Sequence, residues 1–126
     1  MQKLVLESKW EKTISPPDLD FIENVFNQTK ITVNEQINFV PIRFAVNHRA
    51  DLLCTTLIHN FTDSPLDLRK IEIIIKKGEK ILTSYLFEED RLQLDAKTSM
   101  PWTFIFPKHT YKEKELDGEL TIDYKG

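Results

Sequence analysis

The stretch from Asp51 to Leu68 constrains the fold most, because a short apolar run is followed at once by a strong turn signal. The run consists of apolar and β-branched residues, which suit a pleated, buried surface: Leu52, Leu53, Thr55, Thr56, Leu57 and Ile58. It is short and shows little alternation, which favours a strand covered on both faces over a helix. Asn60 to Pro65 follows, and its Asn, Asp and Pro are turn formers. We predict a central strand and then a turn whose one apolar residue, Phe61, folds back over the core.

Other segments repeat this pattern of short strands and polar turns. Ile37 to Val46 alternates apolar and other residues, and Pro41 predicts an edge position because proline cannot donate to a ladder. Lys70 to Lys76 and Lys80 to Glu88 predict a hairpin around Lys77-Gly78. Shorter strands are expected at Lys3–Lys9, Leu92–Leu94, Ser99–Pro107 and Glu119–Lys125, and Ile31–Val33 fits either a strand start or a linker.

One amphipathic helix is predicted near the start. Ser15 and Asp18 have the spacing of a capping box, and a proline suits the first helical position. The helix is expected to run to about Lys30, with its apolar face formed by Leu19, Ile22, Val25 and Phe26 and with Phe21 beside it. This face is expected to pack on a sheet, and the alternative is a helix that binds a partner.

The length of 126 residues predicts one domain, residues 1–126. Strands spaced by about ten residues, with a single helix, predict a mainly β fold. We expect an antiparallel, immunoglobulin-like β-sandwich with one N-terminal amphipathic helix.

Charge and hydropathy exclude several functional classes. A net charge of −3 argues against binding to nucleic acid or to an anionic membrane surface. Met1 to Trp10 contains no long apolar run, so neither a signal peptide nor a membrane span is expected there. We therefore expect a cytoplasmic location.

Residues that carry out catalysis or bind metals do not form a recognisable pattern. Cys54 is the only cysteine, which rules out an intrachain disulfide and predicts a small buried hydrophobe rather than a reactive thiol. His48, His59 and His109 lack the spacing of metal ligands and are expected at the surface. Cys54 and His59 are an odd number of residues apart, so on one strand they point to opposite faces and do not form a nucleophile pair.

The acidic run from Glu88 to Asp90 lacks the length and the glycine of a calcium-binding loop, so a solvated turn is expected. The three glycines do not cluster as a phosphate-binding loop requires. No catalytic, cofactor or metal site is therefore predicted. The alternative is a regulatory domain that binds a small ligand or a metal through His48, His59 and Glu88–Asp90.

Two places are candidates for binding a partner. Asn47, His48 and Arg49 form either a plain turn or a binding loop, and their composition favours the turn. Trp102 shares one face of a strand with Phe104 and Phe106, which predicts core, with an exposed binding stripe as the alternative.

Four segments resemble the SLAP domain of Gram-positive bacteria. They are Ile14–Asn27, Phe39–His48, Asp51–Asn60 and Thr98–Pro107, of which the last contains the most specific motif, TSMPWTF. The resemblance covers about Met1 to Lys108 in a single copy. It implies a non-enzymatic protein-interaction domain that assists export by an accessory Sec system or assembly of the S-layer. The implied partner is the export machinery or a surface-layer precursor, which edge strands could bind by strand addition.

Overall fold

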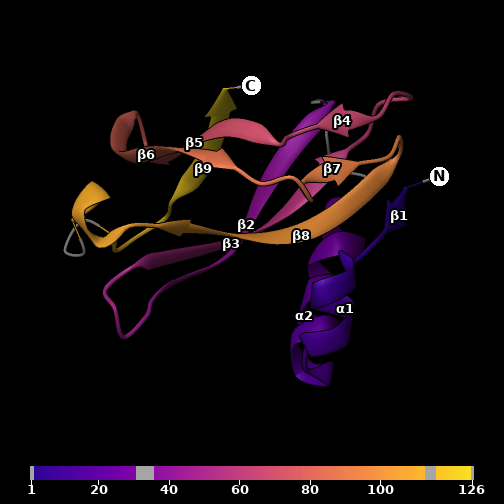
Figure 1. The fold of residues 1–126 in the computed structure, drawn as a ribbon, viewed down its shortest axis with the longest axis horizontal. Coiled ribbons are helices and arrows are strands. Elements are labelled where there is room, and N and C mark those ends of the chain that lie inside the picture. Colours follow the sequence, from indigo (N-terminus) through magenta and orange to yellow (C-terminus); the bar gives the residue numbers. More distant parts are fainter. Residues whose placement is uncertain (1, 31–35, 113–115, 126) are drawn as a thin grey trace.

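The computed structural model describes residues 2–30, 36–112 and 116–125. Strands dominate this part of the chain, and two helices lie near its start (Figure 1). The elements are β1 (Lys3–Leu4), α1 (Ser8–Thr13), α2 (Pro16–Thr29), β2 (Ile37–Val46), β3 (Leu52–Asn60), β4 (Leu66–Asp67), β5 (Lys70–Lys77), β6 (Lys80–Glu88), β7 (Gln93–Leu94), β8 (Thr98–Phe106), the 3-10 turn η1 (Lys108–Thr110) and β9 (Thr121–Lys125). The possible strand at 31–33 lies outside the described residues.

A four-stranded sheet in the order β1-β8-β3-β2 forms the centre of the fold. β3 is antiparallel to both of its neighbours, and Cys54 lies between Phe44 of β2 and Phe104 of β8. The predicted central strand is therefore confirmed. β2 lies at the edge, and its register shifts between Pro41 and Arg43, as expected where a proline interrupts the ladder.

A three-stranded sheet in the order β6-β5-β9 faces the first sheet, and β4 pairs with β7. β5 and β6 form the predicted hairpin, and Gly78 in its turn has a φ of 62°, which glycine adopts without a steric penalty. β2 also contacts β9, so the strands curl around one core. Its fully buried members come from both sheets and the connecting segments: Leu52, Cys54, Ile58, Ile71, Ile73, Ile75, Leu92 and Phe106.

The mainly β prediction is confirmed, but the architecture is not clearly an immunoglobulin-like sandwich. The central sheet is mixed, because β1 runs parallel to β8, and it curls as a half-barrel beside two small sheets. A second helix is also present. α1 occupies residues that the apolar pattern assigned in part to a strand, and the Glu7 carboxylate caps it by accepting a hydrogen bond from the Lys9 amide at 2.9 Å.

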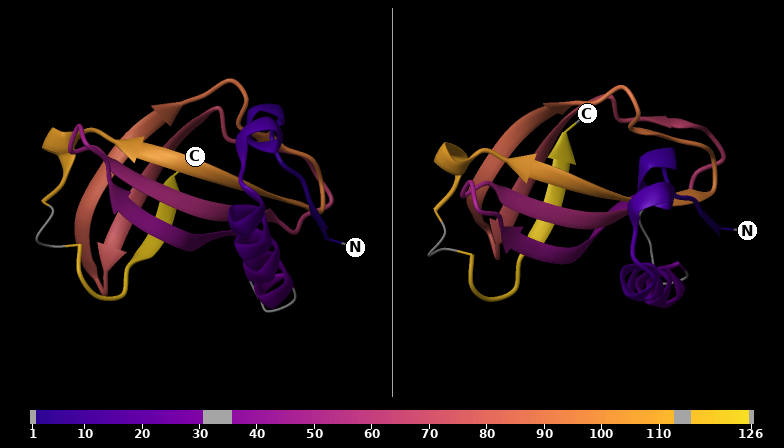
Figure 2. Two further views of the ribbon diagram at one scale, coloured as in Figure 1. Left: turned by 90° about the horizontal axis from the view of Figure 1, so that it is seen from below. Right: turned by 60° about the horizontal axis from the view of Figure 1, so that its bottom comes forward.

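The predicted amphipathic helix is α2. Ser15 is its N-cap, and the Ser15 hydroxyl accepts a hydrogen bond from the Asp18 amide at 3.3 Å. Ile22 and Phe26 are buried against Leu57, which lies on the face of the central sheet opposite the main core. Figure 2 shows the helices gathered at one end of the long strands, with β5, β6 and β9 toward the other end. The expectation that this helix packs on a sheet is confirmed.

Candidate functional site

His59 lies at the junction of α2 with the central sheet and is fully buried, with 0% of its surface exposed. The expectation of a surface histidine is wrong at this position, because α2 covers the end of β3. It holds for His48 and His109, which are exposed. Phe61 stacks on the His59 ring with 4.8 Å between ring centroids, so the turn after β3 does fold back as predicted.

The hydrogen bonds around His59 fix its tautomer. The Thr29 hydroxyl lies 2.7 Å from the Val25 carbonyl, to which it donates its one proton. It must then accept from Nε2 of His59, which lies 2.7 Å away. On the other side of the ring, the Ser99 hydroxyl lies 2.6 Å from Nδ1, and it also accepts from the Gln2 amide at 2.9 Å. Nε2 of His59 therefore carries a proton, and in the neutral ring Ser99 donates to Nδ1.

Burial lowers the pKa of His59 to about 4, because a charged imidazole would lose its hydration there. The contact between Ser99 and His59 resembles a nucleophile and its base, but Ser99 is also fully buried and both ring nitrogens already have partners. A substrate could not reach this pair. The network instead ties α2, β3, β8 and the N-terminal segment together.

Cys54 lies on the opposite face of β3, in the main core. It is fully buried, and burial raises the pKa of its thiol to about 12. The prediction of a small buried hydrophobe is confirmed. The thiolate, which is the reactive form of cysteine, is not populated at neutral pH.

An open cleft of about 520 Å³ lies between the helices and the outer face of the central sheet. Its lining comes from five separate parts of the chain: Lys9, Trp10, Thr13, Ile14, Ser15, Asp18, Phe21 and Ile22 from the helical segment, Ile42 and Arg43 from β2, Thr55 from β3, Arg91 from the turn after β6, and Trp102 and Thr103 from β8. Phe21 is 46% exposed, although it belongs to a helix that buries its other phenylalanine. The cleft is thus partly apolar and open to solvent.

Charged side chains at the cleft are mostly cationic. The lining contains three cationic side chains, Lys9, Arg43 and Arg91, and one carboxylate, Asp18. Its formal charge is therefore +2, whereas the whole chain has a net charge of −3. Arg43 lies 3.4 Å from the Asp18 carboxylate, and more than half of each side chain is exposed. Exposed ion pairs of this kind contribute little to stability, so they can exchange partners at low cost.

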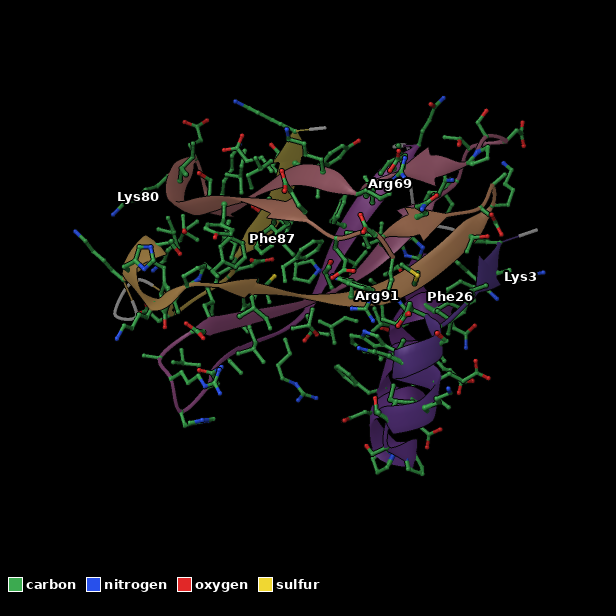
Figure 3. The ribbon with its side chains drawn as sticks, viewed as in Figure 1. Lys3, Phe26, Arg69, Lys80, Phe87 and Arg91 are labelled. Atoms are coloured by element: carbon green, nitrogen blue, oxygen red, sulfur yellow. The ribbon has the colours of Figure 1, made fainter. Side chains whose placement is uncertain are left out.

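Arg91 connects the cleft to the turn after β6, above the helices in Figure 3. Its guanidinium lies 3.0 Å from Glu89 and 3.3 Å from Glu7, and it lies 5.3 Å from the centroid of the Trp102 ring. The hydrogen bond from Arg91 lowers the pKa of Glu89. The acidic turn at Glu88–Asp90 therefore forms an ion pair with Arg91 through Glu89. No group of three His, Cys, Asp or Glu side chains among the described residues is placed to hold a metal ion.

The candidate partner-binding residues lie in two places. Asn47, His48 and Arg49 form the turn between β2 and β3, and the Asn47 side chain accepts hydrogen bonds from the Arg49 and Asp51 amides at 2.9 and 3.0 Å. Trp102 of β8 is 7% exposed and lies opposite Thr56 of β3. The predicted core position of Trp102 is confirmed, and its remaining surface borders the cleft.

Sequence reasoning missed the cleft, although it left one signal. Phe21 falls beside the apolar face of the predicted helix rather than on it, which places a large aromatic side chain toward solvent. None of the helices in 2–30, 36–112 and 116–125 is long and apolar enough to cross a membrane.

Comparison with known proteins identifies one family. The family model described as SLAP domain matches residues 4–121, nearly the whole chain. No curated protein and no solved structure matches this chain.

Proposed function

The chain belongs to the SLAP domain family, and from this premise we propose that it is a protein-interaction domain that assists accessory Sec export or S-layer assembly. The family is associated with the accessory Sec system and the S-layer, and it is not a known catalytic family. We place its action in the cytoplasm, where a translocase receives its precursors.

The observation that carries this proposal is the cleft beside α2. Phe21 is nearly half exposed there, and Trp10, Ile14 and Ile42 are partly exposed. These side chains could gain further burial from a partner, at roughly 25 cal/mol for each Å² of apolar surface removed from water. An aromatic side chain in such a cleft is the kind of residue that dominates binding energy at protein interfaces.

The chemistry of the cleft defines the segment that it would bind. An apolar side chain would lie against Phe21 and Trp10, and a neighbouring carboxylate would lie against Arg43 or Lys9. A segment of an export component or of a surface-layer precursor with this pattern is the proposed ligand. Trp102 contributes one wall of the cleft, whereas the turn at Asn47, His48 and Arg49 is a separate surface, and its role in binding stays a prediction.

The experiment is capture of proteins from a Gram-positive lysate by the purified chain, with crosslinking and mass spectrometry. We expect translocase components or surface-layer precursors in the wild-type sample, and we expect Phe21→Ser and Arg43→Glu to lose them. Ile105→Ser and Lys108→Glu are matched controls, because both side chains are exposed and lie outside the cleft. Equal capture by all five proteins would overturn the assignment of the cleft, and no captured export or surface-layer protein would overturn the function.

A second candidate function is a regulatory domain that binds a small ligand. The cleft volume of about 520 Å³ is in the range of small-molecule sites, and this observation favours the alternative. Binding of a metal through His48, His59 and Glu88–Asp90 is no longer supported, because His59 is buried and Glu89 forms an ion pair with Arg91. A thermal-shift screen separates the two functions, because a ligand at 100 times its Kd adds about 2.7 kcal/mol of stability.

A further inference from the structure

Arg43 differs from the other cationic side chains of the cleft, because few contacts hold its guanidinium group. Within the described part of the chain it makes one hydrogen bond, to the Asp18 carboxylate, and the distance of 3.4 Å is long for such a bond. The Arg43 side chain is 58% exposed. A guanidinium group has five N–H donors, so most donors of Arg43 are available to a partner.

The other two cations lie near carboxylates of the chain itself. Arg91, labelled in Figure 3, forms ion pairs with Glu89 at 3.0 Å and with Glu7 at 3.3 Å. The pKa of Glu89 is lowered first by the hydrogen bond from Arg91 and also by the charge of Lys9, so Lys9 acts on the same carboxylate. Arg91 and Lys9 are thus compensated by two glutamates, whereas Arg43 depends on one long contact.

The fold directs the Arg43 side chain into the cleft. The register of β2 shifts between Pro41 and Arg43, and irregularities of this kind redirect side chains and are common beside functional sites. Arg43 lies opposite Thr55, which lines the cleft, while the next residue, Phe44, packs against the main core. The backbone of Arg43 is therefore fixed by the ladder, and its side chain rises from the outer face of the sheet.

The contact between Arg43 and Asp18 lies beside the exposed aromatic side chain of the cleft. Asp18 and Phe21 are three residues apart on α2, so they are neighbours on the surface of the helix. Phe21 is 46% exposed. A segment bound here would therefore need a carboxylate next to an apolar side chain. Arginine suits the first of these groups, because its planar donors match both oxygens of a carboxylate.

We propose that Arg43 recognises a carboxylate of the partner segment, and that Asp18 occupies Arg43 in the unbound chain and is displaced on binding. The inference rests on the proposed function, which takes the cleft as the binding site. Displacement costs little, because an ion pair between two side chains that are both more than half exposed contributes little. Asp18 then remains in the first turn of α2, where the helix dipole favours a carboxylate.

Selection from a library of random dodecapeptides displayed on phage tests the chemistry of the segment. The purified wild-type chain is expected to enrich peptides in which Asp or Glu adjoins an aromatic or aliphatic residue. Arg43→Glu reverses the charge and is expected to lose these peptides. A wild-type chain that enriches no acidic peptides, or an Arg43→Glu variant that enriches the same ones, would overturn the proposal.

Affinities for the most enriched peptide, labelled with fluorescein and followed by anisotropy, separate Arg43 from the other cations. Arg43→Gln is expected to raise the Kd by roughly tenfold, because it removes charge-assisted hydrogen bonds to the peptide. Lys9→Gln removes one positive charge from the same cleft and is expected to change the Kd by less than about twofold. Equal weakening by the two variants would contradict the role of Arg43.

The same assay tests the competition by Asp18. Asp18→Asn frees Arg43 and is expected to lower the Kd by about two- to fivefold, but to have no effect in the Arg43→Gln background. Asp67→Asn is the matched control, because it breaks the similarly exposed pair with Arg69, outside the cleft, with the same change in net charge. An Asp18→Asn variant that binds no more tightly than Asp67→Asn would rule out the competition.

The results also separate this proposal from the proposed function. Acidic peptides that depend on Arg43, together with a lysate capture that lacks export and surface-layer proteins, would overturn the proposed function alone. Capture of those proteins, together with a peptide selection that does not depend on Arg43, would overturn the role of Arg43 alone.

Discussion

Acidification is predicted to weaken the fold through His59. The pKa of His59 is about 4 in the folded chain against an ordinary value of 6.5, so between these values the unfolded state binds the proton and the folded state does not. Stability therefore falls as the pH falls through this window. The difference between the two pKa values corresponds to about 2 kcal/mol of stability lost by pH 5 and about 3 kcal/mol lost by pH 4, relative to pH 8.

The assay is urea unfolding at a series of pH values from 5 to 8, followed by tryptophan fluorescence. Carboxylates change the free energy of unfolding mainly at lower pH. For example, the hydrogen bond from Arg69 lowers the pKa of Asp67 to about 2, so the stability that this pair supplies is lost only as the pH falls below about 4. The window above pH 5 therefore reports on histidine.

Substitution isolates the source of the slope. His59→Gln removes the titrating group and is expected to flatten the stability profile between pH 5 and 7. It also lowers stability at pH 8 by about 1 to 3 kcal/mol, because Thr29 and Ser99 lose hydrogen-bond partners. The control is the double variant His48→Gln/His109→Gln, in which both exposed histidines are replaced, and it should keep the wild-type slope. An unchanged slope in His59→Gln would refute the reasoning.

Three further predictions follow from the packing and the backbone. Ile22→Ala, at the contact of α2 with the sheet, is expected to lower the free energy of unfolding by about 2 to 4 kcal/mol, as measured by urea denaturation. Cys54 is expected to resist iodoacetamide at pH 7 in the native chain and to react once urea unfolds it, as followed by mass spectrometry. Ala50 has a φ of 64°, a left-handed conformation that strains any residue with a Cβ atom. Ala50→Gly is therefore expected to stabilise the fold by about 1 kcal/mol and to raise the thermal midpoint. The control Ala45→Gly, within β2, should lower the midpoint.

Local patterns in the sequence predicted most of the elements. Alternation and turn residues located the hairpin of β5 and β6, and the Ser15 cap located α2, because these signals act over a few residues. α1 was missed because the apolar residues before it favour a strand, and the Glu7 cap is a weak signal on its own. The mixed sheet depends on pairing of Lys3 with Thr98, which are far apart in the chain, and no local pattern encodes such a pairing.

The sites were harder to predict for the same reason. His59 was expected at the surface because it ends a strand, and its burial depends on α2, Gln2 and Ser99 arriving from other parts of the chain. The cleft likewise combines the helices with three strands. The burial of Cys54 was predictable, since the strand around it is apolar on both sides.

The most direct test of the proposed function is site-specific photocrosslinking in living cells. A photoreactive amino acid would replace Phe21 in the cleft, and in a second strain it would replace Ile105, which is equally exposed outside the cleft. The proposal predicts crosslinks from position 21 to an accessory Sec component or a surface-layer precursor, and it predicts none of these from position 105. The same crosslinks from both positions, or none to export or surface-layer proteins from position 21, would contradict it.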